Sequence, residues 1–419
     1  MLITHATSAA PPWLLLYSAA DHAGLADAAR ADAKSLAQGN DPATAGRRAP
    51  GLCRLAVTAG DRDGLVEGLT FFADGLASPR WATGRADGAA ERVAWCFGGH
   101  GSQWLGMGRA MLDWSPEAEA VLTELDDLLP GGVLGPLTGQ VEMPQDSPAA
   151  TQPLIFAVQV ATARWLWALG FRPAVVIGHS LGEVAAAHVS GALGLSEAAR
   201  VVTTRSRLLD AVGDGGAMAT VGLDRETTAA RCAAAVGGKV VVAAHSAPEE
   251  TVITGDEQAT TALLADLQTE GVRCRRIRIT AASHSPRVDG VLAELRAELA
   301  DLAPARAYTA WVSTVDPSSR PRADADYWAR NLRQPVRFTE AVSTLAGRGI
   351  RAFLEIGPHP VLLKPLRDTL DADGVDEPLL TASGHRGTPE PVSLLRALGA
   401  LYCRGADVPV PTDRGLEWI

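Results

Sequence analysis

One segment decides the fold: Val175-Val176-Ile177-Gly178-His179-Ser180-Leu181-Gly182-Glu183. Its β-branched residues predict a buried strand, and the alanine-rich run that follows predicts a helix. The Gly-x-Ser-x-Gly pattern between them is typical of a nucleophile elbow, a sharp turn that projects the serine hydroxyl. The amino end of the helix adds a positive dipole where an oxyanion would form. The segment predicts an α/β fold with Ser180 as candidate nucleophile; a purely structural glycine-rich turn is the alternative.

A serine hydroxyl is a weak nucleophile until a base accepts its proton, so a histidine partner is needed. The chain has nine histidines, and their spacing alone does not choose among them. His284 follows the predicted return from an inserted subdomain, a natural place to line a cleft. His188 and His359 fit core or cap positions equally well. From the residues alone, His284 is one of several candidates, expected to titrate near the ordinary imidazole pKa of about 6.5.

Strands alternate with helices over most of the chain, which predicts a parallel sheet flanked by helices. Between residues 216 and 280 the order changes to strand, helix, two strands, helix, strand, the split ferredoxin-like arrangement. We therefore expect four parts. They are a small α/β domain (1–92), a large subdomain (93–215 and 281–373), an inserted small subdomain (216–280) and a tail with one helix (374–419).

Composition excludes several classes of protein. Hydrophobic residues make up 47% of the 419 and charged residues 21%, as in a soluble globular protein, and the net charge of -10 argues against nucleic-acid binding. Five scattered cysteines, without a Cys/His cluster, favour reduced thiols in a cytoplasm and no metal site. The apolar run at 13–17 is too short to span a membrane, and the N-terminus lacks the basic region of a signal peptide.

Further motifs make the chain resemble the acyltransferase domains of modular type I polyketide synthases, relatives of malonyl-CoA:carrier-protein transacylases. The motifs are Phe97-Gly98-Gly99-His100-Gly101-Ser102-Gln103-Trp104 (similar to FPGQGSQW), residues 178–183 (GHSxGE), residues 281–286 (xAxHSP), and residues 327–338 and 355–360. Residues 1–92 look like the linker between a ketosynthase and its acyltransferase, and the tail looks like the linker that follows. The resemblance implies an α/β-hydrolase-like large subdomain with a ferredoxin-like insertion.

The resemblance also implies roles for individual residues. It makes Ser180 the acyl-accepting nucleophile and His284 its base, with Asn331 as the source of the carbonyl that orients the histidine. By the same resemblance, the backbone N–H groups of His100 and Leu181 form the oxyanion hole. Arg205 is then the residue that holds the free carboxylate of a malonyl-type substrate. His100 stands where most of the family has Gln. Because a backbone donor is used there, we expect the exchange to be tolerated.

Substrate choice in the family is associated with the tetrapeptide that ends in the catalytic histidine, here Ala281-Ala282-Ser283-His284. Malonyl-type members usually have HAFH there and methylmalonyl-type members YASH. Ser283 and Ala281 are small, which predicts a wide pocket that admits an α-substituent. Gln103 is a further candidate specificity residue. Leu181 and residues 151–153 instead look malonyl-like, so the extender unit is left open.

The expected reaction is a two-step acyl transfer from acyl-CoA through Ser180 to the phosphopantetheine thiol of an acyl carrier protein, in polyketide or antibiotic biosynthesis. No bound cofactor or metal is expected, and a ketosynthase is a further candidate partner through residues 1–92. Three alternatives stay open: a starter-unit transferase for monocarboxylic acyl groups, a serine hydrolase such as an editing thioesterase, and a scaffold that docks carrier proteins.

Overall fold

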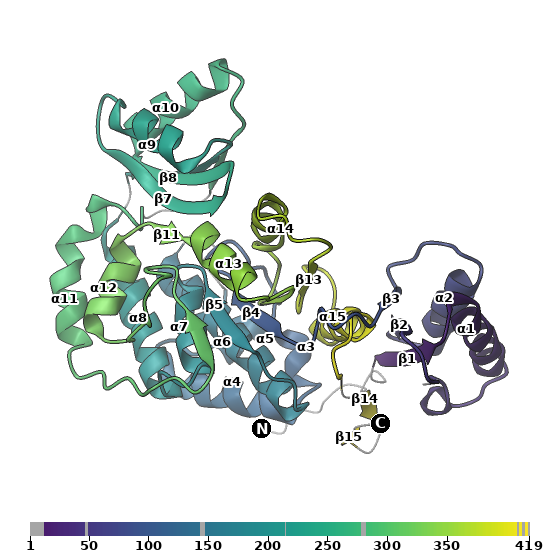
Figure 1. Cartoon of the computed structure of the whole chain (residues 1–419). Coiled ribbons are helices and arrows are strands. Elements are labelled where there is room, and N and C mark those ends of the chain that lie inside the picture. Colours follow the sequence, from purple (N-terminus) through teal and green to yellow (C-terminus); the bar gives the residue numbers. More distant parts are fainter. Residues whose placement is uncertain are drawn as a thin grey trace.

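The computed structural model describes residues 12–46, 49–142, 147–213, 215–277 and 282–408, and the backbone of 410–412 and 415–417. Figure 1 shows three regions: a large central subdomain, a small lobe that contains α9 and α10, and an N-terminal unit that contains α1 and α2. No helix within these ranges is long and apolar enough to cross a membrane.

The large subdomain is built on a five-stranded sheet in the order β10-β5-β4-β12-β13. Its strands are β4 (Val93–Phe97), β5 (Val175–Gly178), β10 (Ala310–Val312), β12 (Ala352–Ile356) and β13 (Leu379–Ala382). Every neighbouring pair is parallel. All residues of β4, β5 and β12 are buried, as expected of a parallel sheet with helices on both faces. The predicted α/β class with a parallel sheet is confirmed.

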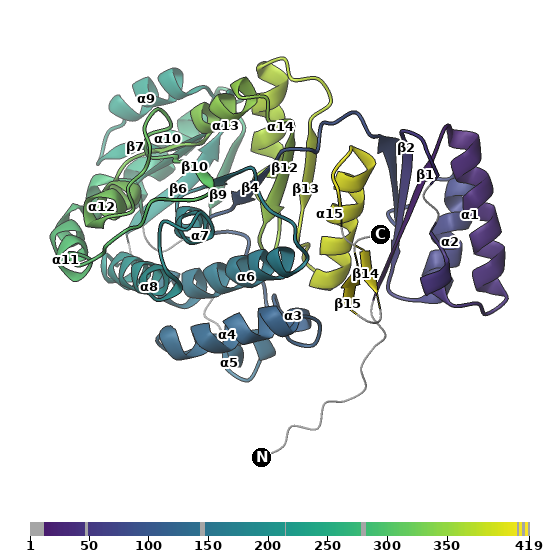
Figure 2. The same cartoon turned by 60° about the horizontal axis from the view of Figure 1, so that its bottom comes forward.

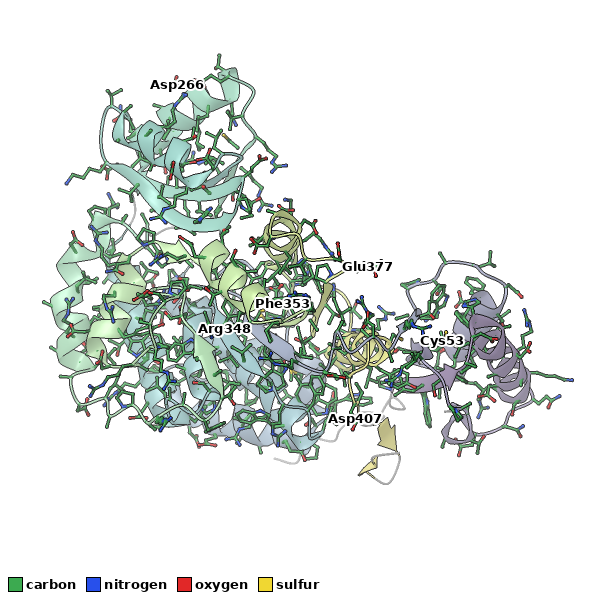
Figure 3. All side chains as sticks on the ribbon, viewed as in Figure 1. Cys53, Asp266, Arg348, Phe353, Glu377 and Asp407 are labelled. Atoms are coloured by element: carbon green, nitrogen blue, oxygen red, sulfur yellow. The ribbon has the colours of Figure 1, made fainter. Side chains whose placement is uncertain are left out.

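Helices cover both faces of this sheet (Figure 2). The large subdomain contains the helices α3 (Arg109–Leu112), α4 (Pro116–Leu128), α5 (Leu134–Thr138), α6 (Pro148–Ala168), α7 (Gly182–Val189), α8 (Leu195–Ala211), α11 (Leu292–Glu298), α12 (Ala325–Arg333), α13 (Phe338–Gly347) and α14 (Leu363–Ala372). Of these, α4 packs against α6 rather than on the sheet itself. Helix α6 is apolar around its circumference because it lies in the core. On the other face, Phe353 of β12 packs with residues of α13 and α14, and its place in the sheet is labelled in Figure 3.

The small subdomain has the split arrangement expected from the sequence. Its elements are β6 (Gly216–Val221), α9 (Arg225–Ala233), β7 (Val240–Ala247), β8 (Glu250–Asp256), α10 (Glu257–Thr269) and β9 (Cys274–Ile277). These strands are antiparallel in the order β7-β8-β6-β9. A short strand of the large subdomain, β11 (Val336–Arg337), extends this sheet by pairing with β7.

The N-terminal unit is a three-stranded antiparallel sheet. Its elements are β1 (Trp13–Ala19), α1 (His22–Ala37), η1 (Pro42–Thr44), β2 (Cys53–Ala59), α2 (Arg62–Ala73) and β3 (Trp81–Arg85). Helices α1 and α2 cover one face, and α15 (Glu390–Cys403) lies between the other face and the large subdomain (Figure 2).

Several short strands lie outside the elements expected from the sequence. Strand β3 belongs to the small α/β domain expected at 1–92, and its side chains are only partly buried or exposed. Strand β13 lies beyond residue 373, where a tail with one helix was expected, yet it completes the large sheet. A two-stranded ribbon, β14 (Val410–Thr412) and β15 (Gly415–Glu417), follows α15.

Candidate active site

The turn between β5 and α7 has the geometry of a nucleophile elbow. Ser180 has φ 54°, in the left-handed region that non-glycine residues rarely adopt. A Cβ atom on Gly178 would lie 2.3 Å from the backbone nitrogen of Glu183, and one on Gly182 would lie 2.0 Å from the carbonyl oxygen of Phe97. Only glycine fits at both positions, which explains the spacing of the motif around Ser180.

Ser180 and His284 lie in contact, as the family resemblance implied. The Oγ atom of Ser180 lies 2.7 Å from Nε2 of His284, and Nδ1 of His284 lies 2.8 Å from the backbone carbonyl oxygen of Gln334. Because a carbonyl oxygen only accepts hydrogen bonds, Nδ1 carries the proton and Nε2 is left to accept the serine hydroxyl. This pairing has the geometry required of a nucleophile and its general base.

The expected role of Asn331 needs a correction. The carbonyl that contacts the histidine belongs to the backbone of Gln334, not to Asn331. The side chain of Asn331 instead accepts a hydrogen bond from Nε of Arg205 at 3.3 Å and donates one to the carbonyl oxygen of Ser180 at 3.1 Å. A backbone carbonyl leaves no side-chain signal in a sequence, so the motif match could not identify Gln334.

Arg205 lies in the same site, where the resemblance placed it. Arg205 belongs to α8, and only 1% of its surface is exposed. Its Nη2 donates a hydrogen bond to Oγ of Ser180 at 3.0 Å. Its Nη1 donates to Oε1 of Gln152 at 2.6 Å. Burial lowers the pKa of Arg205 to about 10, so the guanidinium is still charged at neutral pH. Gln152 was not identified from the sequence as a partner of this arginine.

The charge of Arg205 is not balanced by any carboxylate of the described residues. The hydrogen-bond partners of its guanidinium, namely Asn331, Gln152 and Ser180, are all neutral. A buried charge without a counter-ion is costly, since the low-dielectric interior does not replace the lost water. The arrangement is therefore suited to receive an anionic group beside Ser180.

Burial and charge also act on the histidine. The pKa of His284 is lowered to about 3, first because burial disfavours the imidazolium and then because Arg205 is close. This value lies well below the ordinary imidazole pKa of about 6.5 that was expected. His284 is therefore neutral over the physiological range, with Nε2 unprotonated. The neighbouring His179 has its pKa lowered to about 4 by burial, and its ring packs against Phe338 with the centroids 5.5 Å apart.

Hydrogen bonds to Glu183 link the turn at Ser180 to other elements of the large subdomain. Its buried carboxylate accepts hydrogen bonds from the backbone N–H and the hydroxyl of Thr314, both at 2.6 Å, from Nε1 of Trp311 at 3.1 Å and from the hydroxyl of Tyr327. Burial raises the pKa of Glu183 to about 7 despite these donors. The last residue of the GHSxGE motif thus anchors the first turn of α7 to β10 and α12.

The two residues expected to supply oxyanion donors both lie near the serine. Leu181 follows Ser180 directly, and His100 lies in the turn after β4 and lines the same cavity. A Cβ atom on Gly99 would lie 3.8 Å from Cβ of Ser180, so the backbone of this turn passes close to the nucleophile. Nε2 of Gln103 lies 3.1 Å from Nε2 of the His100 ring, so Gln103 contacts the turn and is not among the residues that line the cavity.

A cavity of about 120 Å³ opens at Ser180 between the two subdomains. Ser283 lines it, as expected of a specificity residue. Ala282 is fully buried outside the lining, and Ala281 lies outside the described residues. The polar lining residues are His100, Gln152, His179, Ser180, Ser283 and His284, and the apolar ones are Pro148, Leu209, Met218, Ala243, Ala244, Val252, Ile277 and Val336. No cluster of three or more metal-ligating side chains occurs in the described ranges.

Comparison with known proteins assigns this fold and site to a class. The family model of the acyl transferase domain matches residues 94–408. The chain therefore belongs to the acyl transferase domain family, whose members are transferase enzymes, and the resemblance seen in the sequence is confirmed.

The relatives are polyketide synthases. The chain is 38% identical over 376 residues to polyketide synthase GfsB of Streptomyces halstedii, covering 87% of this chain and 7% of that protein. It is 37% identical over 373 residues to erythronolide synthase EryA3 of Saccharopolyspora erythraea, covering 87% of this chain and 12% of that protein. The chain thus spans only a small part of the length of these relatives.

Solved acyltransferase domains share the fold. The crystal structure of the acyltransferase domain from module 8 of the salinomycin polyketide synthase has a TM-score of 0.88 and 34% identity, covering 96% of this chain and 97% of that one. The acyl transferase domain of SpnD, in complex with 2-(pent-4-yn-1-yl)malonyl, has a TM-score of 0.81 and 28% identity, covering 94% of this chain and 96% of that one.

Proposed function

We propose that this domain transfers a malonyl-type, α-substituted extender unit from acyl-CoA to the phosphopantetheine thiol of an acyl carrier protein, through an ester on Ser180. One observation carries the proposal. The Oγ atom of Ser180 is contacted by a neutral base, His284, at 2.7 Å and by a buried, uncompensated cation, Arg205, at 3.0 Å. The nucleophilic oxygen of Ser180 is thus in contact with both a general base and an anion-binding group.

In the first step Oγ of Ser180 attacks the thioester carbonyl of the acyl-CoA while Nε2 of His284 accepts the hydroxyl proton. Backbone N–H groups of Leu181 and His100 stabilise the negative charge on the tetrahedral oxygen. When this intermediate collapses, the C–S bond breaks, and the CoA sulfur leaves with the proton from His284.

In the second step the thiol of the carrier protein gives its proton to His284 and attacks the acyl-serine ester. The ester C–O bond breaks, and Oγ of Ser180 regains the proton. The route uses no bound metal or redox group. We expect the reaction to take place in the cytoplasm, with a ketosynthase as a further partner through residues 1–92.

Arg205 distinguishes malonyl-type substrates from others in this proposal. The free carboxylate of the substrate would supply the counter-ion that the guanidinium lacks, whereas a monocarboxylic acyl group would leave the buried charge unpaired. This disfavours a starter-unit transferase and a hydrolase of simple thioesters. The α-substituent is supported by the small Ser283 and by the apolar part of the cavity. The SpnD domain, which is similar to this chain, was solved with an alkylmalonyl group.

Intact-protein mass spectrometry tests the proposal. Wild-type protein is incubated with malonyl-, methylmalonyl-, ethylmalonyl- and acetyl-CoA, with Ser180→Ala as the control. We expect a covalent adduct of malonyl-type groups on the wild type, none on Ser180→Ala, and transfer to an added carrier protein. A wild type that acquires acetyl but no malonyl-type group would indicate a starter-unit transferase. Rapid hydrolysis without a carrier would indicate a hydrolase, and the absence of any adduct a scaffold.

A further inference from the structure

The cavity at Ser180 has two unlike walls. The wall from the large subdomain carries the polar groups, including Ser180, His284 and Gln152. The wall from the small subdomain consists of side chains without hydrogen-bonding groups: Met218, Ala243, Ala244, Val252 and Ile277. Such a wall favours hydrocarbon over water or polar groups.

The two walls restrict how a malonyl-type group can lie. In the proposed function, the thioester carbon meets Oγ of Ser180 and the free carboxylate meets Arg205. Those contacts fix two of the groups attached to the α-carbon near the polar wall. An alkyl substituent on the same carbon is then left to face the small subdomain.

A β-bulge shapes the apolar wall. Val242 of β7 pairs with Ile253, and Ala244 pairs with the next residue of β8, Val252, so Ala243 has no partner in the ladder. Bulges re-aim side chains and occur next to active sites. Here Ala243 and Ala244 are 1% and 3% exposed, and both line the cavity. The bulge therefore presents two methyl-sized side chains at one place, where larger residues would fill the space.

Strand β7 is linked through β11 to His284, the proposed base. Val336 of β11 stands opposite Ala244 in the parallel pairing with β7. Two residues before Val336, the carbonyl oxygen of Gln334 accepts the hydrogen bond from Nδ1 of His284. A change at Ala244 would therefore disturb the orientation of the base. Ala243 belongs to no ladder pair, so of the two alanines at the bulge it is the one whose size changes the wall without changing the base.

We propose that the bulge residue Ala243 sets the size of the α-alkyl substituent that the site admits. The inference rests on the proposed function and deepens it. It assigns selection of the substituent to the small subdomain, and gives the tetrapeptide that ends in His284 a secondary part.

The test compares acylation rates of the wild type and Ala243→Leu with malonyl-, methylmalonyl- and ethylmalonyl-CoA. We expect the ratio of alkylmalonyl to malonyl acylation to fall by roughly 10-fold or more, the discrimination that about one methylene of lost space produces. Malonyl acylation should persist and shows that the variant is folded. Ala247→Leu is the matched control, because Ala247 is a buried alanine of the same strand that does not line the cavity.

A second variant covers the case in which leucine prevents folding. Ala243→Gly widens the wall, and glycine is well tolerated in a bulge. We expect it to raise the ratio of ethylmalonyl to methylmalonyl acylation. Unchanged ratios in both variants, or a loss of alkylmalonyl preference with Ser283→Phe but not with Ala243→Leu, would overturn the assignment of Ala243. A wild type that loads no malonyl-type group overturns the proposed function itself, which is a different result.

Discussion

The guanidinium of Arg205 lies 3.0 Å from the hydroxyl oxygen of Ser180, the same atom that the imidazole of His284 contacts at 2.7 Å. A cation beside a serine oxygen favours negative charge on that oxygen. The same cation disfavours protonation of the histidine, so the base stays neutral. One buried arginine therefore acts both on the nucleophile and on its base before any substrate binds.

Replacing Arg205 should change which acyl groups are loaded. In Arg205→Ala, the enzyme should stabilise the transition state for a malonyl-type substrate by roughly 2–5 kcal/mol less than the wild type does, as when one partner of a desolvated charge pair is removed. Acetyl-CoA should be affected less. Acylation rates with the two donors measure the difference. Arg207→Ala is the control, because Arg207 lies two residues further along α8 but pairs with Glu294 and Glu298 at the surface. Equal losses for both donors would contradict a carboxylate-binding role.

The pH dependence of acylation should reflect the lowered pKa of His284. A base works in its neutral form, and with a pKa near 3 that form predominates from pH 5 to pH 8. We therefore expect the acylation rate constant to stay level as the pH falls from 7 to 5. His284→Ala should lower it by roughly 10²- to 10⁴-fold. Single-turnover acylation across this range is the measurement, and a half-maximal rate near pH 6.5 would show an unperturbed histidine.

The variant Asn331→Ala distinguishes a role of Asn331 in holding Arg205 from a role in orienting His284. Since Asn331 contacts Nε of Arg205 and the histidine is held by Gln334, the variant should lose preference for malonyl-type over acetyl donors. Its pH profile should match that of the wild type. A proportional loss with both donors, together with a shifted pH profile, would instead mean that Asn331 acts through His284.

Glu183 should make stability depend on pH. Its pKa is raised from 4.5 to about 7 in the folded protein, so the stability it contributes is fully present below about pH 4.5 and is lost as the pH rises through 7. Glu183→Gln has no such titration. The free energy of unfolding of the wild type, relative to the variant, should therefore decrease between pH 5 and pH 8. Urea unfolding at both pH values tests this, and an increase would have the wrong sign.

The sequence by itself predicted the features that depend on neighbours in the chain. The elbow around Ser180 is a strand, a turn and a helix in succession, and its glycines are required by the close approach of nearby backbone. The split arrangement of the small subdomain follows from the order of its strands and helices. Family motifs added His284 and Arg205, which are far from Ser180 in the chain and close to it in the fold.

Only the tertiary structure decided what surrounds those residues. The carbonyl of Gln334, the amide of Gln152 and the bulge at Ala243 reach the site from three separate segments, and the first of these groups is backbone. The shifted pKa of His284 likewise arises from burial and from Arg205 together. Local pattern in a sequence reports the conformation of one segment, whereas desolvation, charge and the shape of a cavity depend on which segments the fold packs together.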